Sequence, residues 1–289
     1  FFMQRKPWLF YALVTTIFWG VWGALSELPQ KAGFPATLGY TVWAVTMIIP
    51  AIAALKIIGW KPEKDKKSIF YGLLIGVTGS AGQLILFQAL KQGPAYLVFP
   101  FVSLSPLVTL FLSLIFLKER AGRKSRIGII IALIAIPMLS YQPHESGHKY
   151  GSLWILLSLL VFLAWGIQAY FMKVANNYMK AESIFFYMTL SGIGLIPFAL
   201  AVTDFSVPIN WGLKGPYMTA GIQILNSIGA LFIVYAFRYG KAIIVSPLIN
   251  TGAPVITIII SLLIYGVFPP VIIITGMILA IIAIFLMAE

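Results

Sequence analysis

Long runs of apolar residues, separated by short polar segments, follow one another along the whole chain. Each run is about 20 residues long, the length that a helix needs to cross a hydrocarbon core of about 30 Å. Because the runs leave no stretch long enough for a water-soluble domain, the pattern predicts an all-α integral membrane protein. The ten predicted membrane-spanning helices cover residues 8–26, 36–58, 68–91, 95–117, 125–141, 152–175, 182–203, 213–237, 241–265 and 269–287.

The second half of the sequence repeats the first at a nearly constant offset. Each copy holds five predicted spans, and because five is an odd number, the second copy enters the membrane in the opposite orientation. We therefore predict two inverted five-helix repeats, residues 1–141 and 151–289, joined by a linker loop at 142–150 within a single membrane domain. The matching segments are GIIIALIAIPML (128–139) with GMILAIIAIFLM (276–287), QALKQGPAYLVFP (88–100) with YAFRYGKAIIVSP (235–247), and FWG (18–20) with AWG (164–166).

The composition agrees with a membrane-embedded chain. Of the 289 residues, 60% are hydrophobic and 10% are charged, and the mean hydropathy is +0.96, whereas a soluble domain is about half apolar and a quarter charged. The sequence contains no cysteine, which excludes disulfides, thiol chemistry and cysteine metal ligands. The first span is longer than the apolar part of a signal peptide and lacks a clear small-x-small cleavage site, so we expect a retained helix.

The formal net charge of +12 is distributed unevenly between alternate loops. On one side lie only Lys31, Lys91, Lys149 and Lys214, and every other Lys or Arg falls on the opposite side. This bias is the positive-inside signature of helical membrane proteins. It predicts that the N- and C-termini are cytoplasmic and that the protein resides in the cytoplasmic (inner) membrane. The basic residues then face anionic lipid, and we expect no nucleic-acid partner.

Prolines recur at equivalent places in the fourth and ninth predicted spans, in VFPFVSLSPLVT (98–109) and VSPLINTGAPVIT (245–257). A proline inside a helix lacks the N–H that would bond to the carbonyl four residues earlier. Irregular backbone is tolerated in a membrane only where it is buried in protein or lines a water-filled cavity. We predict that two central helices bend and gate at these prolines; the alternative is a kink that only improves packing. The four residues are Pro100, Pro106, Pro247 and Pro254.

Neutral polar and aromatic side chains lie deep in several spans. A membrane amide either bonds to a neighbouring helix or faces a polar cavity, and Trp or Tyr is normally found at the membrane interface. Trp19 and Trp165, however, lie near the middle of their spans at equivalent repeat positions, as expected for walls of a substrate site. The predicted substrate-binding residues are Trp19, Trp22, Gln83, Ser103, Trp165, Gln168, Tyr170, Gln223, Asn226 and Asn250.

Ionisable side chains are nearly absent from the interior of the predicted spans. Glu27, at the end of the first span, is the candidate for proton coupling at the mouth of a cavity; the alternative is a charge at the interface. A substrate site built from aromatic rings and amides, without charged side chains, suits a neutral or zwitterionic molecule, for example a sugar, an amino acid or a nucleoside. We predict no metal site and no cofactor, since His144, Glu145 and His148 of one outer loop are only a weak metal candidate.

The segment SLSPLVTLFLSLIFLKERAGRKSRIGIIIALIAIPML (103–139) resembles the ten-helix, EamA-type class of the drug/metabolite transporter superfamily. It contains a proline-bearing fourth helix, a Leu-x-Glu-Arg turn at 117–120 and a glycine-containing fifth helix, and the resemblance extends over essentially the whole chain. It implies a cavity formed mainly by helices 1, 3, 4, 6, 8 and 9. The second half departs from the pattern, because IYGVFPPVIIITG (264–276) replaces the acidic-basic turn. We expect Glu119 to orient that turn or to close a gate by ion pairing, rather than to bind substrate.

These features predict a secondary transporter that moves a small metabolite across the membrane by alternating access, through a central cavity between the repeats. The alternatives are a channel and a non-transporting membrane scaffold or receptor. An intramembrane enzyme would need an acid, base, nucleophile or metal set within the spans. The sequence offers none, so we expect no catalytic residues. The expected partners are a small-molecule substrate and the lipid bilayer, and the expected state is a monomer or weak homodimer.

Overall fold

Helices form all the regular structure of residues 6–93, 95–141, 152–266 and 268–288, which the computed structural model describes. Helices are expected here because a backbone segment in lipid must pair its own N–H and C=O groups. The elements are α1 (Pro7–Leu25), α2 (Glu27–Lys31), α3 (Ala36–Thr46), α4 (Ile48–Ile57), α5 (Lys66–Gln92), α6 (Ala95–Ser103), α7 (Pro106–Ile115), α8 (Arg123–Leu139), α9 (Leu153–Ala175), α10 (Ala181–Gly194), α11 (Ile196–Ala201), the π-helix η1 (Leu213–Tyr217), α12 (Met218–Tyr239), α13 (Ala242–Tyr265) and α14 (Val271–Ala288).

Eight helical segments of the described chain are long and apolar enough to cross a membrane. They coincide with eight of the predicted spans and confirm the multi-pass, all-α character of the protein. The eight segments are Pro7–Lys31, Ala36–Ile57, Lys66–Gln92, Leu153–Ala175, Ala181–Ala201, Leu213–Tyr239, Ala242–Ile264 and Val271–Ala288.

The two remaining predicted spans, 95–117 and 125–141, take a different form. The first is interrupted, because α6 ends at Ser103 and α7 begins at Pro106 after a short turn. Pro106 occupies the first helical position, where its missing N–H costs no intrahelical hydrogen bond. The second is α8, a helix of 17 residues whose first turn carries Arg123, Lys124 and Arg126.

The predicted proline bends therefore have different outcomes in the two halves. Only at Pro106 does a helix begin anew, whereas α13 continues through both Pro247 and Pro254. Pro100 lies within α6, and its side chain is outside the described part of the structure. The second proline segment, 245–257, is one residue longer than the first, 98–109. The longer segment forms an unbroken helix, whereas the shorter one contains a turn.

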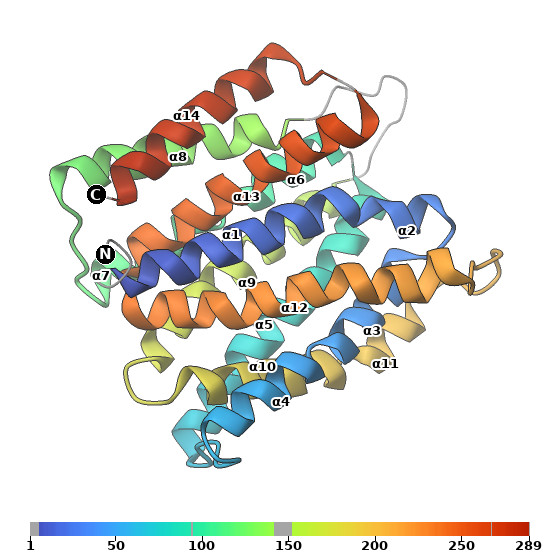
Figure 1. Cartoon of the computed structure of the whole chain (residues 1–289), viewed down its shortest axis with the longest axis horizontal. Helices are drawn as coiled ribbons and strands as arrows, with labels where there is room; N and C mark the ends of the chain where they lie inside the picture. Colours follow the sequence, from blue (N-terminus) through green and yellow to red (C-terminus); the bar gives the residue numbers. More distant parts are fainter. Residues whose placement is uncertain (1–5, 94, 142–151, 267, 289) are drawn as a thin grey trace.

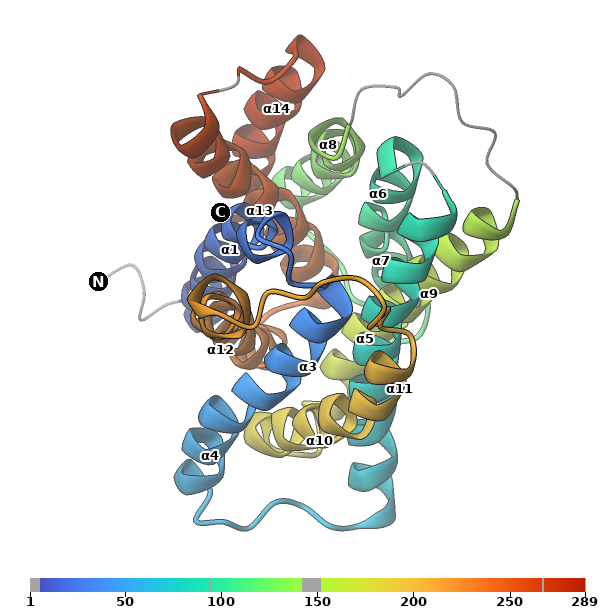
Figure 2. The same ribbon diagram turned by 90° about the vertical axis from the view of Figure 1, so that its right-hand side faces the viewer.

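The helices form a bundle in which α8 and α14 pack along each other at one edge (Figure 1). At the opposite edge lie α3, α4, α10 and α11 (Figures 1 and 2). Between these edges α1 packs against α12 and α13, and α5 packs against α9 and α10. The centre of the bundle is therefore built by helices from both halves of the chain.

The α5 helix begins with a side-chain cap outside its membrane-spanning segment. Asp65 Oδ1 accepts hydrogen bonds from the backbone N–H groups of Lys67 and Ser68, at 3.1 and 3.0 Å. These are two of the N–H groups that a helix leaves unpaired at its start. Hydrogen bonds from the hydroxyl and N–H of Ser68 lower the pKa of Asp65, so the cap stays ionised to lower pH than a free aspartate.

Two of the hydrogen bonds between the two halves of the chain form an exchanged pair. Thr257 of α13 donates to the carbonyl oxygen of Gly20 on α1 at 2.9 Å, and Thr109 of α7 donates to that of Gly166 on α9 at 3.0 Å. Gly20 and Gly166 are sequence counterparts in the two predicted repeats, as are Thr109 and Thr257. The two bonds therefore join equivalent residues, and each half supplies the donor in one bond and the acceptor in the other.

Two glycines, Gly128 and Gly276, allow α8 and α14 to approach each other closely. A Cβ at Gly128 would lie 2.9 Å from the carbonyl oxygen of Ala283, and one at Gly276 would lie 2.9 Å from Cβ of Met138. Small residues at helix contacts replace the hydrophobic driving force that lipid does not provide. The two glycines are again counterparts in the repeats.

Replacing Gly128 or Gly276 with leucine is expected to destabilise the protein by about 1–3 kcal/mol, the cost of overpacking a close contact. The nearest atom to a side chain at Gly128 is the backbone carbonyl oxygen of Ala283, which cannot move aside as a flexible side chain can. The two helices would therefore have to separate and lose part of their contact. The measurement is the thermal unfolding midpoint in detergent. Gly194→Leu is the matched control, because a Cβ there meets nothing within 4 Å; equal effects at all three positions would contradict the prediction.

Candidate functional site

A cavity of about 410 Å³ lies among the central helices and is lined by residues of both halves. Small-molecule sites in proteins typically enclose about 300–1,000 Å³. Among the described residues that line it, there is no Asp, Glu, Lys or Arg. Its wall combines aromatic, aliphatic and methionine side chains with amides and hydroxyls, a mixture that favours a neutral or zwitterionic molecule over one of strong net charge.

The cavity brings together most of the substrate-binding residues that the sequence predicts. They come from helices far apart in the chain, with α1, α5 and α6 from the first half and α9, α12 and α13 from the second. The predicted residues that line the cavity are Trp19, Trp22, Gln83, Ser103, Trp165, Gln168, Asn226 and Asn250, and Pro254 lies beside them.

Two other predicted binding residues lie away from the cavity wall. Tyr170 packs against the rings of Phe116 and Phe171. Gln223 stands behind Trp22, because its Oε1 accepts a hydrogen bond of 3.0 Å from the Trp22 indole N–H. Gln223 thus positions a lining side chain without lining the cavity itself.

Three of the proton-coupling and gating candidates, Glu27, Pro106 and Pro247, also lie outside the cavity. Glu27 forms an ion pair with Lys31 at 2.8 Å, and both side chains are about 60% exposed. Pro106 is buried at the start of α7, and Pro247 is buried inside α13. None of these three side chains is among the cavity-lining residues.

Two tryptophans form equivalent parts of the wall. The Trp19 indole N–H donates to the backbone carbonyl of Asn226 on α12, and the Trp165 indole N–H donates to that of Gly79 on α5, both at 3.3 Å. Each indole also lies on a glycine, since a Cβ at Gly229 would clash with Trp19 and one at Gly82 would clash with Trp165. The glycines give the rings room, and the carbonyls fix their orientation.

Three side-chain amides at the cavity have no hydrogen-bond partner within the described part of the chain. They belong to Gln83, Gln168 and Asn226. All three side chains are partly exposed, so their polar atoms face the cavity instead of being sealed between helices. Polar groups inside proteins are nearly always paired, so water or a bound molecule must supply these partners.

Other polar groups at the wall are held by short bonds to their own surroundings. Asn250 Nδ2 donates to the carbonyl oxygen of Ser246 at 2.9 Å, which leaves its Oδ1 available. The hydroxyls of Ser103 and Ser140 lie 2.8 Å apart. These bonds fix the position of the side chains, and preorganised polar groups are what a specific site requires.

The cavity is closed at the end nearest the basic loops. There Phe237 and Ile249 are fully buried and Ser246 is 3% exposed. At the other end of the cavity, the lining residues Trp22, Gln83 and Ser140 are only partly buried. The cavity thus approaches one face of the molecule and is sealed from the other.

Three side-chain bonds tie helices together at the sealed end. Glu119 Oε2 accepts the backbone N–H of Ile243 in the first turn of α13, at 3.1 Å. Lys241 donates to the Arg120 carbonyl at 2.6 Å, and Lys173 donates to the Phe237 carbonyl at 3.0 Å. Glu119 was expected to orient its turn or to close a gate by ion pairing. Within the described residues its carboxylate makes no ion pair and caps α13, where it meets the positive end of the helix dipole.

Several lining residues were not among the predicted binding residues. Trp43 lies inside a predicted span, as Trp19 and Trp165 do, and an indole within a span was the available signal. Met47, Met172 and Met188 also line the cavity, but a methionine in an apolar helix has no sequence feature that distinguishes a cavity wall from a lipid contact. The weak metal candidates His144, Glu145 and His148 lie outside the described residues.

These observations define a class of protein: a multi-pass helical membrane protein whose cavity lacks charged lining residues in the described chain and is enclosed by helices of both halves, the architecture of a solute carrier. The family model for EamA-like transporters matches residues 6–141 and 152–288. The chain therefore belongs to the EamA-like transporter family, and the predicted resemblance to the drug/metabolite transporter superfamily is confirmed.

Comparisons with individual proteins agree with this assignment. An uncharacterized transporter of Archaeoglobus fulgidus is 29% identical over 196 residues, which cover 67% of each chain. An uncharacterized protein of Methanocaldococcus jannaschii is 38% identical over 76 residues, and the match spans only 56% of that protein and 26% of this chain. A crystal structure of a protein with no stated function has a TM-score of 0.79 at 15% identity, over 98% of this chain and 96% of the other. That last likeness concerns the fold alone.

Proposed function

We propose that this EamA-family transporter is a secondary carrier of a small neutral or zwitterionic metabolite, such as a sugar, an amino acid or a nucleoside. The observation that carries the proposal is the set of unpaired amides of Gln83, Gln168 and Asn226 in a cavity without charged side chains. Amides can both donate and accept hydrogen bonds, and the neighbouring indoles offer flat apolar faces. Together they suit a compact molecule that carries hydroxyl, amide or ring groups.

Ten membrane crossings, arranged as two inverted repeats, are part of this proposal. The family model matches once in each half, and α6–α7 and α8 take the places of the fourth and fifth crossings in the first match. The hydrogen bonds of Thr257 to Gly20 and of Thr109 to Gly166 support a two-fold relation. If a two-fold axis relates the halves, a contact between two residues must recur between their counterparts in the other half. An axis in the membrane plane then inverts one repeat relative to the other.

Alternating access follows from this arrangement. In the described structure the cavity is sealed beside the basic loops, which the positive-inside rule places in the cytoplasm together with both termini. We therefore assign the structure to an outward-facing state of a protein in the cytoplasmic membrane. Breaking the bonds of Glu119, Lys173 and Lys241 would open the cytoplasmic end, while the opposite end closes.

Two experiments test the function. A thermal-shift screen of the purified protein against sugars, amino acids and nucleosides identifies a ligand, since a molecule bound only by the folded state raises stability. Counterflow of the labelled ligand in sealed vesicles then tests transport: a carrier exchanges it at a saturable rate. A rate that rises linearly with concentration would replace the carrier with a channel, and binding without exchange would indicate a receptor.

Asn226→Ala is expected to weaken binding of the ligand from that screen by about 2- to 12-fold, because one net hydrogen bond contributes about 0.5–1.5 kcal/mol. The backbone carbonyl of Asn226 remains, so the bond from Trp19 and the fold are retained. The measurement is the ligand concentration that gives half of the thermal shift. Asn177→Ala, an exposed position at the end of α9, is the control, and unchanged affinity in Asn226→Ala would remove this residue from the site.

A further inference from the structure

Two walls of the central cavity come from opposite sides of the bundle. The helices α1 and α12 contribute one wall, and α5 and α9 contribute the other. The first pair lies in front of the second in Figure 1 and to its left in Figure 2. In the predicted repeats α1 is the counterpart of α9, and α5 is the counterpart of α12. The two walls would therefore be alike if both copies had the same sequence.

The walls differ in where they carry side-chain amides. Gln168 of α9 takes the place that Trp22 has on α1, at an offset of 146 residues. Gln83 of α5 takes the place that Ala230 has on α12, at an offset of 147 residues. The amide of Gln168 lies against Gly79 of α5, where a Cβ would clash with it. The α5–α9 wall thus offers two amides at positions where the other wall offers an indole and a methyl group.

The α1–α12 wall is mainly aromatic. Trp19 and Trp22 are three residues apart on one helix, so their side chains lie on the same face. Both line the cavity, and their N–H groups already donate to the Asn226 carbonyl and to Gln223 Oε1. What they offer a solute is a pair of flat apolar rings, to which α12 adds the amide of Asn226.

This division of the cavity selects among the solute classes of the proposed function. A sugar carries hydroxyls around its whole ring, and those facing the indoles would lose water without gaining a partner. An amino acid carries two full charges, and no Asp, Glu, Lys or Arg among the described lining residues would pair them. A nucleobase is uncharged and flat, and every base stacks on aromatic rings. Its edge carries donors and acceptors that a glutamine amide can pair.

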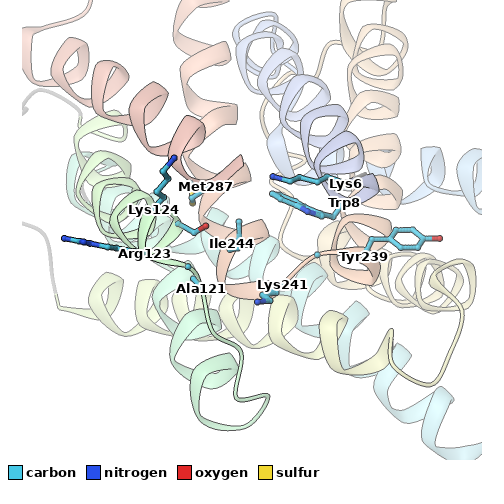
Figure 3. Close-up of a pocket in the computed structure, with 12 residues that line it drawn as sticks. Lys6, Trp8, Ala121, Arg123, Lys124, Tyr239, Lys241, Ile244 and Met287 are labelled. Atoms are coloured by element: carbon cyan, nitrogen blue, oxygen red, sulfur yellow. The ribbon is translucent and has the colours of Figure 1, made fainter. Parts of the chain in front are cut away.

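A second cavity of about 620 Å³ does not offer this combination. Figure 3 shows Trp8 and Tyr239 among its lining residues, together with Arg123 and Lys241. No Asn or Gln is among its described lining residues, and it shares none of them with the central cavity. A flat neutral ring would find no amide there to pair its edge.

We propose that the transported solute is a nucleobase or a nucleoside, held with its ring on Trp19 and Trp22 and with one edge toward Gln83 and Gln168. This inference rests on the proposed carrier function and narrows it to one class of solute. The indoles supply affinity that tolerates any base, whereas the two glutamines determine which base is preferred. Gln83 and Gln168 are therefore specificity-determining residues.

The test is a thermal-shift measurement on the purified protein with adenosine, inosine, ribose, glucose and leucine as separate probes. Adenosine or inosine is expected to raise the unfolding midpoint saturably, and ribose, which lacks the base, is not. The two nucleosides differ at one edge of the ring, which carries an amino donor in adenosine and a carbonyl acceptor in inosine.

Variants separate stacking from recognition of the edge. Gln168→Leu and Gln83→Leu should each change the ratio of the adenosine and inosine affinities by about fivefold or more. Trp22→Ala should weaken both affinities by about fivefold or more and leave their ratio unchanged. Gln92→Leu is the matched control, because Gln92 is an exposed glutamine at the end of α5 and lines neither cavity. It should change neither affinity by more than about twofold.

The outcomes distinguish this inference from the carrier proposal. Stabilisation by ribose, glucose or leucine but by neither nucleoside would overturn the inference and leave the carrier proposal intact. No stabilisation by any probe would count against both. The unfolding midpoint of each free variant is recorded, and the two glutamine variants are independent tests, so misfolding of one leaves the other. An affinity ratio that stays unchanged when a folded glutamine variant is compared with the native protein would overturn the specificity role.

Discussion

Trp165→Ala and Trp19→Ala are each expected to weaken binding of the ligand identified by the thermal-shift screen by about 30-fold or more. A buried tryptophan at the centre of a contact commonly contributes at least about 2 kcal/mol, which corresponds to this factor. Both indoles already use their N–H groups on backbone carbonyls, so their faces are what remains for a ligand. The measurement is the half-saturating ligand concentration, with the unfolding midpoint of each free variant recorded alongside.

Glycine variants test whether the ligand needs the indole rings in their present position, because they move the rings without removing them. Gly82→Leu and Gly229→Leu retain the tryptophans, but the new side chain must displace the indole that lies on each glycine. Loss of affinity similar to that of the alanine variants is therefore expected at both positions. Gly221→Leu is the control on α12, since a Cβ there meets nothing within 4 Å. Full affinity in Gly82→Leu and Gly229→Leu would show that the ligand does not contact these rings.

A comparison of the affinity losses in Gly82→Leu and Gly229→Leu also tests the proposed two-fold relation between the halves. If the halves are related by a two-fold axis through the cavity, Trp19 on Gly229 and Trp165 on Gly82 are the same contact made twice. Similar losses at both positions then follow from geometry. A loss confined to one position would place the solute against one half and leave the other tryptophan as packing.

Helices and their approximate ends could be predicted from apolar length alone, because a membrane restricts a single chain segment to this structure. What the sequence could not predict was the break between Ser103 and Pro106 and its absence at Pro254. Pro254 removes one hydrogen bond inside a helix that continues, whereas Pro106 at a helix start removes none. Whether the helix then ends or continues depends on neighbouring helices that satisfy the freed carbonyl, and a linear sequence does not contain those neighbours.

The orientation of side chains about each helix was harder to predict than the helices. In a soluble helix, polar residues mark the face exposed to water. Here the lipid-facing and core-facing residues are both apolar, so Tyr170 and Gln168 gave equal signals although only Gln168 lines the cavity. Repeat symmetry supplied the missing information for Trp19 and Trp165, because two equivalent positions rarely agree by chance.

Glu119→Ala is expected to open the sealed end of the central cavity, which we propose faces the cytoplasm. The carboxylate of Glu119 caps α13 at Ile243, and a hydrogen bond to a charged group contributes about 1.5–3 kcal/mol. Its loss should shift the equilibrium between the two access states by about 10- to 150-fold toward the inward-facing state. Glu119→Gln, which keeps a neutral acceptor, should produce a smaller shift in the same direction.

Labelling of a single cysteine measures this shift without a known substrate, because the native sequence contains no cysteine. Ser246→Cys is a near-isosteric change at the sealed end of the cavity, where Ser246 is 3% exposed. A membrane-impermeant maleimide added from the cytoplasmic side should label this cysteine slowly in an otherwise native chain, and at least about tenfold faster with Glu119→Ala. Ser140→Cys, at the partly exposed other end of the same cavity, should be labelled from the opposite side in an otherwise native chain and lose that labelling in the same variant. Faster labelling from both sides would indicate loosening of the fold, and unchanged labelling would show that the Glu119 cap does not hold the cavity closed.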